Sequence, residues 1–378
     1  MIIGIDASRA VKKERTGTEN YSRNLIFELA KIDAKNQYIL YVGPDYDGTF
    51  DNFPKNFSIK IIPNKKYWTQ IGLSFEMFKN KPDVLFIPSH ILPPIPAKKA
   101  IITIHDLAWK YFPDMYSPAE LRLQDLSIRR AIKQEAEIIV YSSSTVRDLQ
   151  KFYKINKNKL HFVPMGFGNL FNNKNRDSQT SRHVQGDTLN QTNSHLSVKT
   201  KQPYLLFVGR IELRKNMTNL IEAYTMLRSE RKINHKLLLV GKPGFGYEKI
   251  KLAIEKSKYK DDIIETGFVS DKDLSQLYKN ASIFVFPSFY EGFGFPIFEA
   301  YSAKIPVITS NTSSMPEVAG KGAILVNPKK PFEIAAAMSQ ILNKPQLREK
   351  LIREGQSQLK HYSWQQCAEY TLKILEIK

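Results

Sequence analysis

A buried-strand pattern, a glycine turn and a helix start follow one another between residues 281 and 303. Residues 281–287 are mostly β-branched, aromatic or otherwise apolar, which predicts a strand that ends at a proline. A helix is expected from Pro296, because a proline in the first turn of a helix loses no hydrogen bond. Gly292 and Gly294 lie between these elements and allow the backbone to approach a ligand closely. Free N–H groups at such a helix start attract anions, so the turn is a candidate anion site.

Two carboxylates bracket this turn. Glu291 precedes the first glycine and would lie beside whatever the turn binds. Glu299 is expected in the first helical turn, where it could accept hydrogen bonds from hydroxyl groups. The alternative is an ordinary strand-to-helix turn in which Glu299 only compensates the helix dipole.

Length and composition indicate two soluble domains. A chain of 378 residues exceeds the ~250–300 residues at which single cores tend to split. Residues 171–202 are nearly free of large apolar side chains, which predicts a polar linker between the domains. The single cysteine, Cys367, excludes an internal disulfide and fits a reducing cytosol. No run of ~18 apolar residues is present, so no membrane span is expected.

The net charge of +19 would attract polyanions such as nucleic acid or an anionic lipid surface. The basic residues are dispersed, and no basic amphipathic helix or zinc-finger spacing is evident. A generally basic surface is therefore the main alternative to membrane binding, and no nucleic-acid partner is expected.

Polar residues also follow other predicted strands. His105 ends the apolar strand 101–104, in the position where open α/β sheets bind ligands. Arg210 and Lys215 follow the strand that starts at residue 204. The planar guanidinium group of Arg210 and the compact ammonium group of Lys215 both suit a diphosphate. Simpler interpretations are a histidine that caps its strand and a solvated basic loop. The Asp-x-Asp at residues 45–47 is better explained by turn chemistry than by metal binding.

These motifs together resemble the retaining nucleotide-sugar glycosyltransferases of the GT-B type, family 4. The spacing of Glu291 and Glu299, with Gly-Phe-Gly after the first acid, is similar to the family's acidic signature. The resemblance implies an α/β fold of two Rossmann-like domains that face each other across a cleft. It assigns residues 1–170 to an acceptor domain and residues 203–361 to a donor domain. The last helix, in residues 362–378, would cross back to complete the first domain.

The resemblance also implies roles for individual residues. Arg210, Lys215 and the helix start would stabilise the departing diphosphate without a metal, and Glu291 would help to position the sugar. His105 would reach a hydroxyl of the sugar, and Glu299 would bind the ribose. The remaining donor-binding residues implied are Gly17, Phe268, Val269, Gly292, Phe293, Gly294 and Phe295.

The implied function is a retaining hexosyltransferase that uses no cofactor, with GDP-mannose as the first expected donor and UDP-sugars as the second. The acceptor would be a saccharide or a lipid-linked saccharide, reached in the cytoplasm or at the inner face of an anionic membrane. Alternatives are another double-Rossmann enzyme, such as a sugar-nucleotide epimerase or a phosphorylase, and a polyanion-binding protein. No Gly-x-Gly-x-x-Gly is present, so a nicotinamide or flavin enzyme is not expected.

Overall fold

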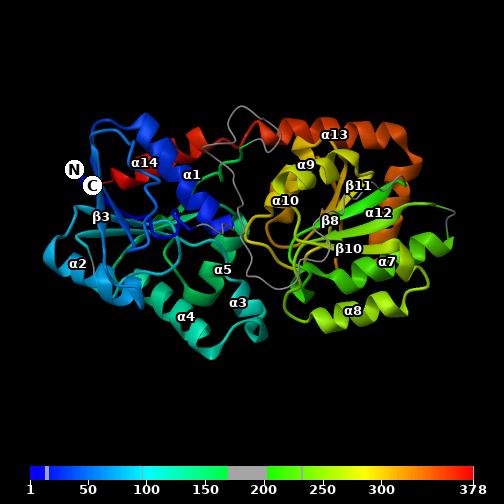
Figure 1. The fold of residues 1–378 in the computed structure, drawn as a ribbon, viewed down its shortest axis with the longest axis horizontal. Helices are drawn as coiled ribbons and strands as arrows, with labels where there is room; N and C mark the ends of the chain where they lie inside the picture. Colours follow the sequence, from blue (N-terminus) through cyan, green and yellow to red (C-terminus); the bar gives the residue numbers. More distant parts are fainter. Residues whose placement is uncertain (13–16, 96, 169–201, 231–232, 378) are drawn as a thin grey trace. The chain divides into compact units, whose positions relative to one another are not determined.

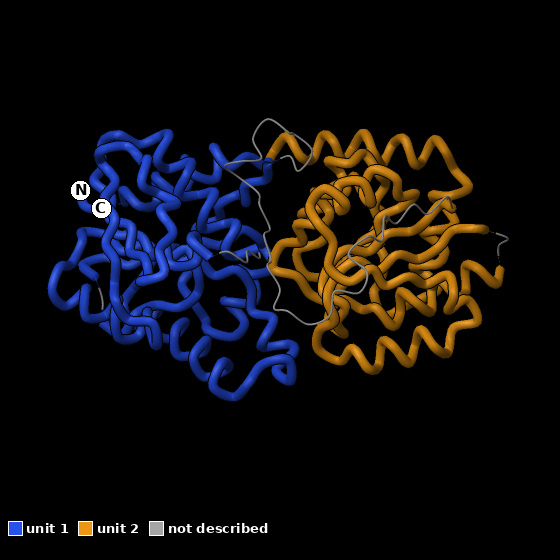
Figure 2. The backbone as a smooth tube through the Cα atoms, in the orientation of Figure 1, with its two compact units in different colours: residues 1–168, 362–378 blue, residues 169–361 orange. Residues whose placement is uncertain are grey.

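The computed structural model describes residues 1–12, 17–95, 97–168, 202–230 and 233–377. The chain divides into two compact units (Figure 2). Unit 1 comprises Met1–Gly168 and Tyr362–Lys378, and unit 2 comprises Asn169–His361. The predicted linker at residues 171–202 lies outside the described residues, apart from Gln202.

Unit 1 is built on a parallel sheet of seven strands in the order β3-β2-β1-β4-β5-β6-β7. All of its strand pairs are parallel, so the strands' carboxyl ends lie along one edge. The strands are β1 (Ile2–Asp6), β2 (Gln37–Val42), β3 (Phe57–Ile61), β4 (Val84–Ile87), β5 (Lys99–Thr103), β6 (Glu137–Val140) and β7 (Leu160–Phe162).

The helices of unit 1 cover this sheet (Figure 1). The longer ones are α1 (Gly17–Ile32), α2 (Ser74–Lys79), α4 (Pro118–Lys133), α5 (Ser143–Tyr153) and the C-terminal α14 (Trp364–Leu375). Short helical turns are η1 (Trp68–Leu73), α3 (Ala108–Tyr111), η2 (Pro113–Met115) and η3 (Lys157–Lys159). The last helix, α14, packs against α1, as the resemblance implies. Trp364 begins it and is almost fully buried.

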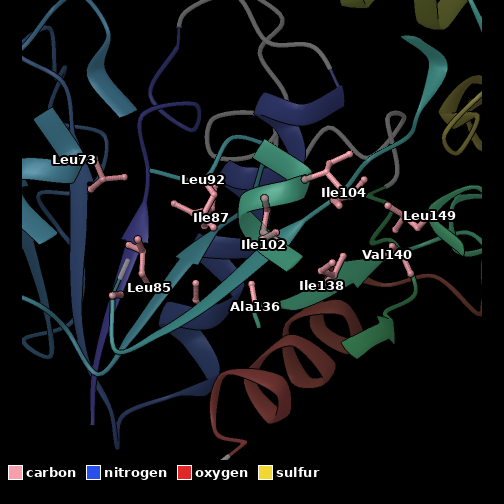
Figure 3. Close-up of a cluster of buried hydrophobic side chains, with 14 of the residues drawn as sticks. Leu73, Leu85, Ile87, Leu92, Ile102, Ile104, Ala136, Ile138, Val140 and Leu149 are labelled. Atoms are coloured by element: carbon pink, nitrogen blue, oxygen red, sulfur yellow. The ribbon is translucent and has the colours of Figure 1, made fainter. Parts of the chain in front are cut away.

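Alternate residues of the central strands form the core on one face of this sheet. Figure 3 shows Leu85 and Ile87 of β4 beside Ile102 of β5 and Ile138 and Val140 of β6. This period of two is what a strand with one face against helices requires. The same cluster includes side chains from η1, α2, α4 and α5, namely Leu73, Met77, Ile128, Ala131 and Leu149.

Unit 2 repeats the design with six parallel strands in the order β10-β9-β8-β11-β12-β13. The strands are β8 (Tyr204–Val208), β9 (Lys236–Val240), β10 (Ile263–Gly267), β11 (Ile283–Phe286), β12 (Val307–Ser310) and β13 (Ala323–Val326). The helical elements are η5 (Leu213–Lys215), α7 (Met217–Glu230), α8 (Tyr247–Lys256), η6 (Lys260–Asp262), α9 (Asp271–Asn280), α10 (Phe295–Ser302), α11 (Met315–Ala319), α12 (Pro331–Asn343) and α13 (Pro345–Leu359). Strands later in the chain are added on one side of β8 up to β10 and then on its other side from β11 onward. Open α/β sheets bind ligands at the point where the strand order changes direction in this way, here between β8 and β11.

The expectation of two Rossmann-like parallel-sheet domains is confirmed. One local difference concerns the helix after the glycine turn. It starts at Phe295, so that Pro296 takes the second helical position. Between β3 and β4, the π-helical turn η1 leads directly into α2.

Candidate active site

The turn between β11 and α10 is fixed by the loop that follows β12. The hydroxyl groups of Ser313 and Ser314 donate to the carbonyl oxygen of Glu291 at 2.6 and 2.9 Å. Ser314 also donates to the carbonyl oxygen of Phe293 at 2.8 Å. These bonds hold the turn through its carbonyl groups.

The turn also carries free backbone donors. The N–H groups of Gly292, Gly294 and Phe295 donate to no described residue. Phe295 begins α10, so these donors lie at the positive end of the helix dipole. Gly294 has a φ of 111°, a conformation that a residue with a side chain rarely adopts. The turn therefore has the geometry that the sequence predicted for an anion site.

Glu291 lies between two cations. Lys215 Nζ is 2.5 Å from Glu291 Oε1, and Arg214 Nη1 is 3.2 Å from Glu291 Oε2. The other guanidinium nitrogen of Arg214 is 2.8 Å from Glu212 Oε1. All four side chains are mostly buried, which strengthens these interactions relative to an exposed ion pair. Burial alone would raise the pKa of Glu291, but Lys215 and Arg214 outweigh it and the pKa is lowered.

Asn216 positions the two cations of this cluster. It follows η5 in a left-handed conformation with a φ of 63° and is completely buried. Its side-chain amide donates to the carbonyl oxygens of Pro287 and Pro328, at 3.0 and 2.6 Å. One asparagine thus ties the basic loop after β8 to the ends of β11 and β13.

Arg210 lies apart from this cluster. It is exposed and makes no ion pair with any described residue. Its Nε lies 3.5 Å from the point that a Cβ on Gly244 would occupy. The structure therefore pairs both Lys215 and Arg214 directly with Glu291, whereas Arg210 remains available to a ligand. Sequence reasoning missed Arg214 and Asn216, although both stand inside the motif that contains Arg210 and Lys215.

Glycines end three adjacent strands of unit 2. Gly209 and Gly241 follow β8 and β9, and Gly267 is the last residue of β10. A Cβ on Gly241 would lie 1.9 Å from the carbonyl oxygen of Gly209, so these two backbones are in close contact. Beyond Gly267, the ring of Phe268 is 46% exposed and Val269 is half-buried. The exposed ring of Phe268 beside these glycines is compatible with stacking on a flat group of the donor, and the donor-binding role that the resemblance implies for it stays a prediction.

Glu299 lies inside unit 2. It is 3% exposed, and its Oε2 accepts a 2.7 Å hydrogen bond from the hydroxyl of Tyr278. Phe293 is also buried and packs edge-on against Phe298, at 5.3 Å between ring centroids. The prediction that Glu299 binds ribose stays a prediction, since one of its oxygens already has a partner within the chain.

His105 lies two residues beyond the end of β5 in unit 1, and both of its ring nitrogens have partners. Nε2 lies 3.1 Å from the carbonyl oxygen of Pro88, which can only accept, so Nε2 carries the proton. Nδ1 then accepts from the hydroxyl of Tyr141. Burial, with a smaller effect of His90, lowers the pKa of His105 to about 3. A hydrogen bond from His105 to a sugar would have to replace one of these bonds, and the predicted role stays a prediction.

A neutral, buried His105 makes the stability of unit 1 depend on pH. In unfolded chains the pKa of histidine is about 6.5. Between this value and the lowered one, the unfolded chain binds a proton that the folded chain does not, so stability falls as the pH falls. We expect His105→Gln to reduce this dependence by about 1 kcal/mol per pH unit below pH ~6.

Urea unfolding followed by tryptophan fluorescence measures this effect, because Trp68, Trp109 and Trp364 all lie in unit 1. Equal pH dependence of the unfolding free energy in wild type and variant would contradict the buried neutral state.

Gly17 is the first residue of α1 and is exposed. Two residues further on, the buried carboxylate of Glu19 forms an ion pair with Arg9 at 2.9 Å. Residues 13–16 lie outside the described part of the chain, so the donor-binding role of Gly17 stays a prediction.

Within the described ranges, no group of three or more His, Cys, Asp or Glu residues is placed to hold a metal ion. The helices described there include none with the length and apolarity to cross a bilayer.

Two family models match the chain. Glycosyltransferase Family 4 matches residues 15–167, and Glycosyl transferases group 1 matches residues 191–358. The chain therefore belongs to the group 1, family 4 glycosyltransferases, and its fold is the GT-B fold of two Rossmann-like units.

Curated relatives include several mannosyltransferases. The chain is 37% identical to O-antigen chain mannosyltransferase B of Escherichia coli, over 47% of this chain and 46% of the relative. It is 26% identical to MMP alpha-(1->4)-mannosyltransferase of Mycolicibacterium hassiacum, over 66% of this chain and 56% of the relative. For WbdA of E. coli, a serotype-specific mannosyltransferase, the aligned segment covers 21% of the relative. The chain thus spans about half or less of the length of these relatives.

Solved structures show the same fold across the whole chain. WaaG, a glycosyltransferase involved in lipopolysaccharide biosynthesis, superposes with a TM-score of 0.69 at 16% identity and covers 100% of both chains. Anabaena HepE, solved with UDP and glucose, superposes with a TM-score of 0.69 at 14% identity, over 100% of this chain and 99% of its own.

Proposed function

We propose that this chain is a retaining hexosyltransferase that moves a hexose from a nucleoside diphosphate sugar to a hydroxyl of a saccharide or lipid-linked saccharide. The observation that carries the proposal is the arrangement around Glu291. Its carboxylate pairs with Lys215 and Arg214, and the free N–H groups of Gly292, Gly294 and Phe295 lie in the same turn. Cations next to a helix start suit the phosphate groups of a diphosphate.

The departing diphosphate would gain negative charge during the reaction, and these groups are placed to stabilise it. Lys215 and the amides of the turn supply fixed positive charge in a mostly buried setting, where it costs little reorganisation. Arg210, which is exposed and unpaired within the described chain, would add a guanidinium to the phosphates. This set of donors requires no metal in the proposed reaction.

Glu291 has two roles in this proposal. Without a ligand, its carboxylate neutralises Lys215 and Arg214. When a diphosphate shares those cations, the carboxylate becomes available to accept hydrogen bonds from the sugar's hydroxyl groups.

Mannose from GDP-mannose is the proposed transfer, because the relatives named above include mannosyltransferases with 26–37% identity. UDP-sugars are the second candidates, since a protein of the same fold has been solved with UDP and glucose. A cytoplasmic location, at the inner face of a membrane when the acceptor is lipid-linked, completes the proposal.

Thermal unfolding with GDP, UDP, ADP, GDP-mannose and UDP-glucose tests this function. A bound nucleotide at ~100 times its dissociation constant stabilises the folded state by about 2.7 kcal/mol. We expect one nucleotide to raise the unfolding midpoint, with or without EDTA, in wild type and not in Lys215→Ala. If no nucleotide shifts the midpoint, the transferase assignment fails. A shift that EDTA abolishes would overturn the metal-free site alone.

A further inference from the structure

The strand order of unit 1 also changes direction, and it does so between β1 and β4. Strands β2 and β3 are added on one side of β1, and β4 to β7 are added on its other side. Open parallel sheets bind ligands beyond the carboxyl ends of the strands at such a point. Four polar side chains come together there, since the charges of three of them act on the ring of the fourth. We call them the switch cluster: Arg9 after β1, Glu19 in the first turn of α1, His90 after β4 and Asp106 after β5.

His90 is the member of this cluster with unused hydrogen-bonding groups. Its ring is half-buried, and neither ring nitrogen bonds to any residue that the structure describes. The ring lies perpendicular to that of His105, at 6.3 Å between centroids. Burial lowers the pKa of His90, and the opposing effect of Asp106 is smaller. The ring is therefore neutral at pH 7 and offers one donor and one acceptor.

The loop that carries His90 is fixed on both sides. Before it, the carbonyl oxygen of Pro88 accepts a hydrogen bond from His105 Nε2 at 3.1 Å. After it, the N–H of Leu92 donates to Ser127 Oγ at 2.8 Å. The side chain of Leu92 also belongs to the buried core shown in Figure 3. His90 is thus held in place, so that a ligand would bind it with little loss of conformational freedom.

The charges of the switch cluster indicate what kind of ligand it suits. Arg9 is its one cation, and this guanidinium is paired with Glu19 at 2.9 Å. Asp106 Oδ1 accepts from the N–H of Ala108 at 2.9 Å, and Oδ2 accepts from no described residue. A phosphate would meet two carboxylates and a single cation that is already paired. Neutral hydroxyl groups, in contrast, can donate to a carboxylate oxygen and can bond to either nitrogen of an imidazole.

We propose that the switch cluster is a saccharide-binding site of unit 1, in which His90 and Asp106 hydrogen-bond hydroxyl groups of the acceptor. His90 contacts the sugar directly, and Asp106 Oδ2 accepts from a second hydroxyl group. His105 acts behind His90 as a positioning residue, because its Nε2 holds the carbonyl group of Pro88 at the start of the loop. The choice of the acceptor as the ligand rests on the proposed function, whereas the preference for neutral hydroxyl groups rests on the cluster itself.

Saturation-transfer NMR of the full chain with methyl α-mannoside, methyl α-glucoside and methyl α-galactoside, without nucleotide, tests this site. We expect at least one of these glycosides to bind the wild type. His90→Phe keeps a ring but offers no hydrogen bond, and should weaken that binding roughly 10-fold. His90→Gln restores a donor and an acceptor and should retain more of the affinity than His90→Phe. Asp106→Asn keeps an acceptor for Ala108 and should weaken binding about 5-fold, because an amide oxygen is a weaker acceptor than a carboxylate.

The matched control is His361→Phe, which changes an exposed histidine of unit 2 and should leave glycoside binding unchanged. Absence of binding by the wild type, or equal binding by the wild type and His90→Phe, would overturn the proposal. Equal loss in His361→Phe would overturn it as well. Unchanged far-UV circular dichroism and unfolding midpoints would exclude misfolding as the cause of lost binding.

The nucleotide experiment separates this inference from the proposed function. Because the diphosphate is assigned to unit 2, His90→Phe should keep the shift of the unfolding midpoint that the nucleotide causes in the wild type. A nucleotide shift without glycoside binding would overturn the saccharide site alone. Glycoside binding that depends on His90, without any nucleotide shift, would support the saccharide site and overturn the proposed function.

Discussion

Lys215→Met is expected to lower kcat/KM for hexose transfer by about 10²–10³-fold, in large part because the donor binds more weakly. Lys215 is the cation closest to Glu291 and would meet the charge that develops on the departing diphosphate. Methionine keeps the length and apolar stem, so the packing of Lys215 over Phe286 is largely preserved. The measurement is the initial rate of nucleoside diphosphate release in the presence of acceptor. Lys249→Met, on the exposed surface of α8, is the control and should retain wild-type rates.

The same change is expected to destabilise unit 2, because it removes one of two cations from a buried carboxylate. Adding Glu291→Gln to Lys215→Met should therefore restore part of the stability without restoring activity. Wild-type kcat/KM in the single variant would contradict the assigned role. Recovery of activity along with stability in the double variant would show that the effect of Lys215 is purely structural.

Gly241→Ala is expected to destabilise unit 2 by at least about 4 kcal/mol. The added Cβ would lie 1.9 Å from the carbonyl oxygen of Gly209, and the φ of 146° is strained for alanine. Since both groups are backbone at the ends of paired strands, neither can move without disturbing the β8–β9 ladder. Gly267→Ala is the matched control. Gly267 has a φ of 67°, and a Cβ added there would meet no atom within 4 Å. Backbone strain alone should therefore cost about 1–2 kcal/mol of stability.

The sequence offers a direct way to separate the units in this experiment. All three tryptophans lie in unit 1, so fluorescence follows unit 1 whereas far-UV circular dichroism follows both units. In Gly241→Ala, we expect loss of structure by circular dichroism before any change in tryptophan fluorescence. Equal stability in the two glycine variants would contradict the close contact between the ends of β8 and β9.

The strands could be predicted from sequence because each is a short apolar run bounded by polar or turn residues. β11 and the glycine turn after it are examples, and the free amides follow from the helix start. The ion pair of Lys215 with Glu291 could not be predicted, since 76 residues separate the partners. Only the parallel pairing of β8 with β11 brings their carboxyl ends together.

Other features were missed because local sequence does not encode them. The two partners of His105 directly follow β6 and β4, so its neutral state is a property of the folded sheet. Asn216 looked like part of a basic loop, but its function depends on two proline carbonyls more than 70 residues away.

Hydrogen–deuterium exchange of the full chain with saturating GDP or GDP-mannose tests the central claim most directly. The claim is that the donor's diphosphate binds at the turn before α10 and the loop that carries Arg210 and Lys215. It predicts slowed exchange in peptides that cover residues 289–299 and 209–216, and no such protection in Lys215→Met. Protection confined to other strand ends, or equal protection in Lys215→Met, would contradict this placement of the diphosphate.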